Sequence, residues 1–251
     1  MGRSLTVPSK RLCAAATLAA AKLYVQERDV HIAVDVGCDH AKLSIYLIQS
    51  GLCSHVYACD IADGPVSKAK NSVKTRTFKG QSLENYIDVV KTDGLSGLEN
   101  VGANRVFILG MGGEVISDIL SKAEFIYESD NVKKIRFILG PMTSQEYLRK
   151  FLYDKGFCID DEILVEDCGR IYTLLSVYYD GFVRKANGLE LLFGKHIIEK
   201  GGPLFEKQLQ RQITICEKAI AQRKAGNLDV EEFEKLYESL VEIKEKKYDN
   251  R

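Results

Sequence analysis

The chain has 251 residues, of which 45% are apolar and 28% charged, and its 35 basic and 35 acidic residues leave no formal net charge. This length accommodates one well-buried domain with an appendage, and no apolar run is long enough to predict a membrane-spanning helix. A neutral chain also produces no global field that would attract nucleic acid, so any such contact must depend on a local concentration of charge.

The first predicted element is an alanine-rich helix over residues 12–21. Pro8 and Ser9 precede it, and serine is a favoured N-cap residue. The alternative is the apolar part of a secretory signal, because Lys10 and Arg11 stand in front of the run. The run is only about ten residues long and ends at Lys22, so the helix is the preferred interpretation.

Repeated strand and helix patterns follow along the chain. Apolar runs at 31–36, 55–60, 86–91, 105–109 and 135–139 each end at a turn bearing glycine or proline, after which a helical pattern begins. Such alternation is typical of right-handed βα units, so these runs predict parallel strands of one sheet.

A hairpin is expected to complete this sheet. After a predicted helix at about 144–155, residues 162–166 and 170–179 have strand patterns and are joined only through Asp167-Cys168-Gly169. This link is too short for a crossover helix, so the two strands must pair antiparallel. A mainly parallel sheet ending in such a hairpin predicts an α/β, Rossmann-like class I methyltransferase domain over residues 1–183.

Residues 184–251 have helical patterns only. Two apolar seams predict a coiled-coil hairpin that reverses at Gly226-Asn227, formed by Leu209, Ile213, Cys216 and Ile220 and by Phe233, Leu236, Leu240 and Ile243. The alternative is that these helices simply pack on the main domain. Nine basic and four acidic residues between 184 and 224 make this segment locally cationic, and a second basic group comprises Lys68, Lys70, Lys74, Arg76 and Lys79.

The strand ends carry the residues that indicate a ligand. Asp35 lies at the end of the first strand and Gly37 follows it, Asp60 ends the second, Asp93 and Gly94 follow the third, and a glycine turn at 110–113 follows the fourth. The carboxyl ends of parallel strands meet at one sheet edge, where open α/β folds bind ligands, and an acid about 20 residues after the first glycine suits a ribose.

The first loop separates two classes of nucleoside cofactor. A dinucleotide loop has a second glycine two residues after the first, because the backbone must approach a pyrophosphate. Here that position is Asp39, whose charge would repel a pyrophosphate but suits the ammonium and sulfonium of S-adenosylmethionine. The sequence therefore favours an S-adenosylmethionine-dependent methyltransferase. Seven cysteines without C-x-x-C spacing and four scattered histidines predict free thiols, no metal site and a cytoplasmic protein.

These motifs resemble those of the bacterial tRNA (adenine(22)-N1)-methyltransferase family. The resemblance covers nearly the whole chain and is carried by the segments Ser9-Lys10-Arg11-Leu12, Asp35-Val36-Gly37-Cys38-Asp39-His40-Ala41, Asp63-Gly64-Pro65, Asp93-Gly94-Leu95 and Gly110-Met111-Gly112-Gly113. It implies methyl transfer from S-adenosylmethionine to N1 of an adenine in tRNA, and a helical tail that helps to hold the tRNA. We expect a monomer or a weak dimer.

The resemblance also implies roles for individual residues. Asp60 would bind the ribose hydroxyls, Ile61 would pack on the adenine, and Asp93 with Gly94 would meet its amino group. Gly110 and Met111 would meet the methionine end together with Asp35, Gly37, Asp39 and His40, and Arg11 would reach its carboxylate. The substrate-binding residues would be Gly112, Gly113, Pro141 and Met142. One departure is Leu139-Gly140-Pro141-Met142, which stands where the family commonly has a Leu-Gln-Pro-Asn-like segment, so backbone groups around Pro141 would have to serve there.

Catalysis is expected to depend mainly on placement. The N1 lone pair of an unpaired adenine is already available, so in-line positioning can supply roughly 7 kcal/mol or more of the barrier reduction. His40 or Asp39 is the candidate for stabilising the cationic product or moving a proton. The alternatives are a methyltransferase for a protein or small molecule, with the tail used for dimerisation, and a non-catalytic adaptor that binds S-adenosylmethionine or RNA.

Overall fold

The computed structural model describes residues 7–21, 31–128 and 134–249. The chain forms two compact units, Met1–His196 and Ile197–Arg251. The first holds the sheet and its covering helices, and the second consists of helices.

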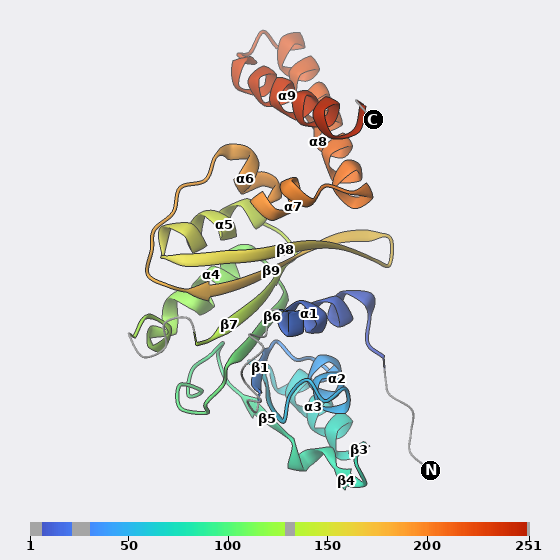
Figure 1. The fold of residues 1–251 in the computed structure, drawn as a ribbon, viewed down its shortest axis with the longest axis vertical. Coiled ribbons are helices and arrows are strands. Elements are labelled where there is room, and N and C mark those ends of the chain that lie inside the picture. The colour runs from blue at the N-terminus through green and yellow to red at the C-terminus, as the bar shows by residue number, and fades with distance from the viewer. Residues whose placement is uncertain (1–6, 22–30, 129–133, 250–251) are drawn as a thin grey trace. The chain divides into compact units, whose positions relative to one another are not determined.

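The sheet of the first unit has the predicted α/β arrangement (Figure 1). Within the described residues it contains seven strands in the order β5-β2-β1-β6-β7-β9-β8. Their bounds are β1 (Ile32–Val36), β2 (His55–Asp60), β5 (Ile87–Lys91), β6 (Arg105–Met111), β7 (Arg136–Pro141), β8 (Phe157–Asp167) and β9 (Arg170–Tyr179). From β5 to β7 every neighbouring pair is parallel, whereas β9 runs antiparallel to both β7 and β8. The predicted parallel sheet with a terminal hairpin is confirmed.

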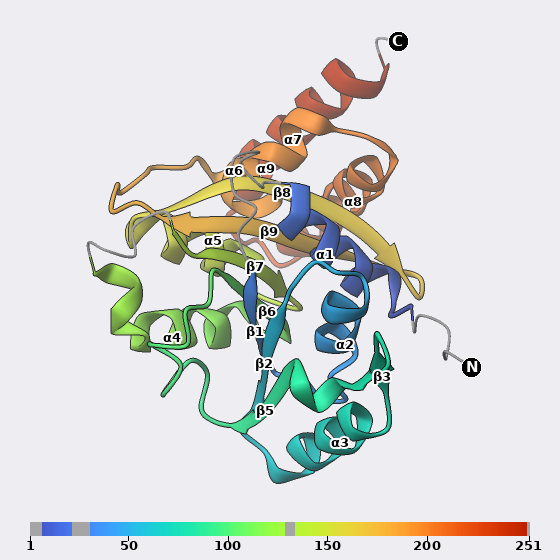
Figure 2. The same cartoon turned by 60° about the horizontal axis from the view of Figure 1, so that its bottom comes forward.

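Helices cover both faces of this sheet. Aliphatic side chains of α1 (Lys10–Ala21), α2 (Lys42–Gln49) and α3 (Asp63–Lys74) form one buried cluster, and those of α4 (Gly113–Lys122) and α5 (Gln145–Asp154) form the other. Figure 2 shows the two layers on either side of the strands. Because both faces are covered, the central strands are almost wholly apolar, as in the burial of β7 over Phe137, Ile138 and Leu139.

Strand β8 begins at Phe157, five residues before the predicted start. The acidic pair Asp160-Asp161 argues against a strand there, but Arg136 donates to Asp160 at 2.5 Å. The register shift between Ile159 and Asp161 absorbs one residue of the irregular segment. A cross-strand ion pair therefore extends the strand into a segment whose local sequence does not indicate one.

A small hairpin was not predicted. Strands β3 (Thr77–Phe78) and β4 (Gln81–Ser82) pair antiparallel between α3 and the 3₁₀ turn η1 (Leu83–Asn85). Lys79 and Gly80 form its two-residue turn with φ values of 49° and 80°. Positive φ at both positions matches the twist of a hairpin, although the strands are too short to leave a sequence pattern.

The division between the two units falls later in the chain than the predicted boundary at 183/184. Helix α6 (Gly188–Phe193) packs on α5 and stays with the first unit. The buried Arg149 guanidinium donates to Glu162 at 2.8 Å and to the carbonyl groups of Leu191, Leu192 and Phe193 at 2.8, 3.0 and 2.9 Å. These carbonyls lie at the end of α6, where the helical hydrogen-bond pattern runs out, and Arg149 donates to all three.

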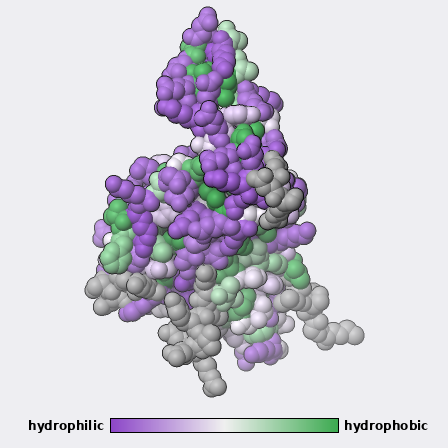
Figure 3. Space-filling view, turned by 45° about the horizontal axis from the view of Figure 1, so that its top comes forward, coloured by the Kyte–Doolittle hydropathy of each residue, from purple (hydrophilic) through white to green (hydrophobic). Residues whose placement is uncertain are grey.

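The second unit is built around an antiparallel helical pair. Helix α8 (Pro203–Ala225) reverses after Gly226-Asn227 into α9 (Glu231–Lys244), with the short α7 (Lys195–Lys200) before them and a π-helical turn (Glu245–Asp249) after them. Lys224 pairs with Glu234 at 2.7 Å near the turn, while the Tyr248 hydroxyl donates to the Gly202 carbonyl at 3.1 Å at the far end. Leu209, Ile213, Cys216 and Leu240 are buried in the pair. Mainly hydrophilic side chains cover its surface, with scattered apolar spots (Figure 3).

Candidate functional site

The Asp35 carboxyl is buried at the carboxyl end of β1, with a relative exposure of 4%. The Ser44 hydroxyl donates to its Oδ2 at 2.6 Å, and the Ser44 backbone amide also donates to the carboxyl. The N-cap of α2 is Ala41, which has no side chain that could cap the helix, so Asp35 satisfies one of its free amide groups instead. Burial raises the pKa of Asp35 to about 6, against the lowering effect of the Ser44 bonds and with a smaller contribution from the charge of Asp60.

The turn after β1 favours glycine at position 37. Gly37 has a φ of 75°, and a Cβ atom there would lie 2.4 Å from the Cε of Met111. The amides of Gly37 and Cys38 both donate to the Cys59 carbonyl, at 2.8 and 3.0 Å. These bonds hold the end of β2 against the first loop, and the Met111 side chain packs beside Gly37, as the strand-end pattern predicts.

Asp60 ends β2, and its Oδ1 accepts the Ala62 amide at 3.0 Å. The neighbouring Ile61 side chain is 63% exposed, which leaves an apolar surface at the rim. The Thr92 amide donates to the Asp60 carbonyl at 3.1 Å, so the segment bearing Asp93 and Gly94 lies directly beside this strand end. Three acids from successive strand ends therefore converge on one edge of the sheet.

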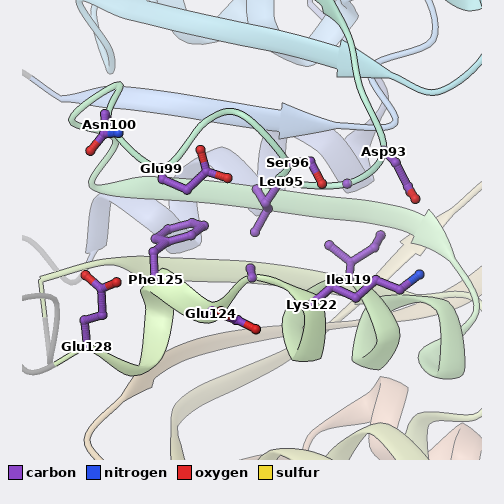
Figure 4. A pocket seen from close by; sticks show the side chains of 12 residues that line it. Asp93, Leu95, Ser96, Glu99, Asn100, Ile119, Lys122, Glu124, Phe125 and Glu128 are labelled. Atoms are coloured by element: carbon purple, nitrogen blue, oxygen red, sulfur yellow. The ribbon is translucent and has the colours of Figure 1, made fainter.

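A cavity of about 560 Å³ starts at Asp93 and Gly94. It continues between the loop 95–100 and the elements α4 and η2 (Glu124–Tyr127), away from the other strand ends (Figure 4). Glu99, Glu124 and Glu128 add negative charge to its wall, and its lysine, Lys122, is paired with Asp118 at 2.6 Å. The other predicted cofactor residues are not part of its wall, so the candidate site is the open rim and the cavity adjoins it.

Gly110 interrupts the end of β6. The register between β6 and β7 shifts between Leu109 and Met111, and Gly110 has a φ of 84° there. Such a bulge turns the backbone of a strand end, and glycine adopts this conformation without strain. The strands run on to Met111 and Pro141, so the predicted glycine turn begins inside a strand.

The Arg11 side chain reaches this bulge from α1. Its two terminal nitrogens lie 3.8 and 3.9 Å from the position that a Cβ atom of residue 110 would occupy. Its guanidinium stacks 4.9 Å from the centre of the Tyr172 ring and contacts the Met142 sulfur at 3.0 Å. The Arg11 amide donates to Asp167 at 3.3 Å, and the pKa of Asp167 is lowered by hydrogen bonds from Ser9 and Arg11. Two contacts with the β8–β9 hairpin thus fix the direction of Arg11.

The turns after β6 and β7 are joined to each other. Met142 donates its amide to the Met111 carbonyl at 2.8 Å, and Gly113 donates to the Thr143 carbonyl at 2.9 Å. A Cβ atom at Gly113 would lie 2.3 Å from the Ser144 carbonyl oxygen. Pro141 is buried and Met142 is 37% exposed, so Met142 is the more accessible of these two predicted substrate residues.

Packing explains why glycine stands at position 140, where the Leu-Gln-Pro-Asn-like segment has a larger side chain. A Cβ atom at this position would lie 2.8 Å from the Cδ2 of Leu109 and 3.1 Å from that of Leu174. These two leucines occupy the space that a side chain at position 140 would need. The fold here accepts glycine, and a longer polar side chain would require both leucines to move.

His40 and Asp39 lie in the first loop, with Asp39 at a φ of 47°. The His40 Nε2 and the Asp39 Oδ2 are 3.7 Å apart, and the two side chains are 42% and 64% exposed. The pair is therefore accessible to solvent and has the geometry of a weak ion pair when the histidine is protonated.

Sequence reasoning missed Ser44, Tyr172 and Thr143. Ser44 is the third residue of α2 and faces Asp35, so a careful reading of the helix start could have found it. Tyr172 and Thr143 reach the site through strand pairing and turn packing, for which the chain has no local signal. The described residues include no group of three or more His, Cys, Asp or Glu suited to a metal ion, and all seven cysteines are free thiols.

None of the described helices combines the length and the apolar character that crossing a bilayer demands.

The strand order, the antiparallel end and the acid-lined rim define a class I methyltransferase fold. A sequence profile described as tRNA (adenine(22)-N(1))-methyltransferase matches residues 33–245, and the chain belongs to this family. It is therefore a tRNA methyltransferase.

Individual relatives agree with this membership. The chain is 28% identical over 189 residues to the tRNA (adenine(22)-N(1))-methyltransferase of Bacillus subtilis (strain 168), which covers 72% of this chain and 74% of that protein. The crystal structure of the B. subtilis M1A22 tRNA methyltransferase TrmK has a TM-score of 0.76 at 26% identity, covering 96% of this chain and 99% of that one. Streptococcus pneumoniae Sp1610, solved in complex with S-adenosyl-L-methionine, has a TM-score of 0.75 at 26% identity and coverages of 94% and 99%.

Proposed function

We propose that this protein transfers the methyl group of S-adenosylmethionine to N1 of adenine 22 of tRNA. The observation that carries the proposal is the convergence of Asp35, Asp60 and Asp93 from three neighbouring strand ends. An acid-lined rim is unsuited to a pyrophosphate and suited to a cationic donor that carries a ribose. The family and the relative solved with S-adenosyl-L-methionine support the same choice.

The cofactor-binding residues fit this donor in size and charge. Asp60 has an Oδ2 available for ribose hydroxyls, since its Oδ1 accepts the Ala62 amide. Ile61 would pack on the adenine, and Asp93 with Gly94 would face its amino group. Asp35 and the Gly110 carbonyl would hold the ammonium, with Gly37, Asp39, His40 and Met111 enclosing it, and Arg11 would pair with the carboxylate.

The bound donor would supply an electrophilic methyl group. The protein has to place the adenine N1 in line with it, and the joined turns after β6 and β7 are the place where Gly112, Gly113, Pro141 and Met142 would contact the base. The glycine turn has no Asn or Asp side chain that would reshape an exocyclic amine, whereas N1 needs no such help. His40 and Asp39 would stabilise the positive charge that arrives on the ring, and no proton transfer is required.

The second unit would contact a part of the tRNA that does not take part in the reaction. Between residues 197 and 224 it carries six basic against three acidic residues, which suits a polyanion. We assign catalysis to the first unit and tRNA contact to the helical pair of α8 and α9. A monomer or weak dimer working in the cytoplasm fits a tRNA substrate and seven free thiols.

The direct test is incubation of the purified protein with labelled S-adenosylmethionine and unmodified tRNA, followed by nucleoside analysis. N1-methyladenosine should form and should be lost on a transcript in which adenine 22 is replaced by guanine. Asp60→Ala should weaken cofactor affinity by about 1–3 kcal/mol, because buried polar partners lose a hydrogen bond. Cofactor binding without methylated tRNA would favour an adaptor or a methyltransferase for another substrate.

Deletion of the second unit tests its role. The cut belongs after His196, because a cut after Tyr179 would remove the carbonyl partners of the buried Arg149. The shortened protein should bind S-adenosylmethionine normally and tRNA weakly. Equal tRNA affinity of the full and shortened chains would contradict the assignment.

A further inference from the structure

A group of cations on α3 and the β3–β4 hairpin has no part in the proposed cofactor site. We call it the α3 cationic surface; its members are Lys68, Lys70, Lys74, Arg76 and Lys79. The four lysines are exposed, and Arg76 is half-buried, with its guanidinium donating to the Ser72 carbonyl at 2.7 Å. Lys70 and Lys74 are one helical turn apart, a spacing at which like charges destabilise a helix.

Nearby acids do not neutralise this surface. The sequence from 64 to 83 has no Asp or Glu. Asp63 pairs with Lys91 at 2.7 Å, and Asp88 pairs with His55 at 2.9 Å when the histidine is protonated. Several lysines elsewhere, such as Lys150 with Asp154 at 2.8 Å, have a carboxylate partner. Among the described residues, none of the four lysines has one, so their charge is available to an anionic partner.

Backbone conformation and aromatic contacts restrict the position of Lys79 in the hairpin. Lys79 adopts a left-handed φ of 49° at the turn, a conformation that costs energy for a residue with a side chain. Its ammonium lies 5.1 Å from the centre of the Phe78 ring, which packs edge-on against Tyr86 at 5.6 Å. The Tyr86 hydroxyl donates to the Gln81 side chain at 2.9 Å. The turn is therefore braced by two aromatic rings, one of which carries the cation.

The position of α3 connects the surface to the proposed site. Helix α3 begins at Asp63, directly after Asp60 and Ile61, and packs on β2 and β5 at the edge of the sheet (Figure 2). Its 12 residues span about 18 Å and lead away from the rim, so Lys74 and the hairpin lie toward the edge where the strands start, as the bond from the Gln49 side chain to the Thr77 carbonyl at 3.3 Å indicates. Strands β2 and β7 are also three places, or about 14 Å, apart across the sheet, so the cations would meet a part of the tRNA that is distant from the reacting adenine.

We propose that the α3 cationic surface binds backbone phosphates of the tRNA at a distance from the adenine that enters the active site. The inference rests on the proposed function and adds a contact to the first unit, separate from the helical pair. Lysine ammonium groups on a flank bind phosphates without reading sequence, so this surface sets the orientation of the tRNA and contributes to affinity. Each neutralised phosphate releases counterions and steepens the salt dependence of binding.

The test compares two triple variants with the same change in charge. Lys70→Gln/Lys74→Gln/Lys79→Gln removes three cations from the surface, and Lys134→Gln/Lys150→Gln/Lys155→Gln removes three exposed cations from other parts of the first unit. tRNA affinity is measured over a salt series, with tRNA KM, kcat and S-adenosylmethionine affinity beside it. Lys70→Arg/Lys74→Arg/Lys79→Arg retains the charge.

The surface variant should lose on the order of 100-fold in tRNA affinity near physiological salt, and its salt slope should fall by roughly 2–3. Its KM for tRNA should rise with kcat and cofactor affinity unchanged, and the arginine variant should restore binding. Equal slopes for the two glutamine variants would overturn the inference. If the unaltered protein itself forms no N1-methyladenosine, the proposed function fails; if it does and the surface variant binds normally, only this inference fails.

Discussion

Asp35→Asn should make the protein more stable at neutral pH and at the same time weaken its hold on S-adenosylmethionine. The carboxyl is 4% exposed, and burial raises its pKa from 3.8 to about 6. The folded state therefore binds the proton more tightly than the unfolded state does. The contribution of Asp35 to stability falls as the pH rises from about 4 to about 6 and then stays constant.

The pKa difference sets the size of the effect. A shift from 3.8 to about 6 corresponds to about 3 kcal/mol of stability lost above pH 6. Of this, about 2 kcal/mol should develop between pH 4.5 and 7.5. Asparagine keeps the shape and an oxygen for the Ser44 hydroxyl but cannot ionise. The difference in unfolding free energy between the variant and the unaltered protein should grow by this amount over that range.

Cofactor affinity should change in the opposite direction. Loss of the charged acceptor that we propose for the ammonium should cost about 1.5–3 kcal/mol, or roughly 10- to 100-fold in affinity. In the unaltered protein the affinity should increase as the pH rises through 6, because the ionised carboxylate is the form that receives the ammonium. In the variant this increase should disappear.

Urea unfolding followed by far-UV circular dichroism measures the first effect, since the chain has no tryptophan, and titration calorimetry measures the second. Ser44→Ala is the matched control: it removes the hydrogen bond at 2.6 Å, retains the charge, and should destabilise the protein at pH 7.5. A stability difference for Asp35→Asn that does not vary with pH would refute the claim that Asp35 titrates with a raised pKa. Unchanged affinity would refute its role at the ammonium.

Two further changes probe the rim. Tyr172→Leu should raise the KM for S-adenosylmethionine several-fold, because the ring 4.9 Å from Arg11 orients the guanidinium, whereas Tyr172→Phe should restore the value; equal kinetics of the two variants would contradict a positioning role. Gly37→Ala should lower stability by about 1–2 kcal/mol because its φ is 75°, and it should weaken cofactor binding because its Cβ would displace the flexible end of Met111 at the rim. Gly51→Ala, with a φ of 73° and open space around it, should cause a similar stability loss and leave cofactor binding unchanged. Equal cofactor affinities of the two glycine variants, measured by calorimetry, would show that the Met111 contact is unimportant.

Local patterns were enough to predict the sheet. Apolar runs such as 31–36 and 55–60 end where β1 and β2 end. The link through Cys168-Gly169 leaves no room for a crossover, so β8 and β9 had to be antiparallel. The same patterns placed acids and glycines at the carboxyl ends of parallel strands. Parallel pairing then brings those ends to one edge, as the bonds from Gly37 and Cys38 to Cys59 show.

Features that depend on contacts between distant segments could not be predicted in this way. The early start of β8 depends on Arg136 meeting Asp160, and the position of the unit boundary depends on Arg149, buried beside Glu162, receiving the end of α6. Arg11 lies 161 positions from Tyr172 and 99 from Gly110, yet the folded chain brings all three together. Periodicity and turn residues report the conformation of neighbouring residues, because they act through the local backbone. A cation stacked on a ring, or a carboxyl deprived of water, exists only after the sheet has closed around it.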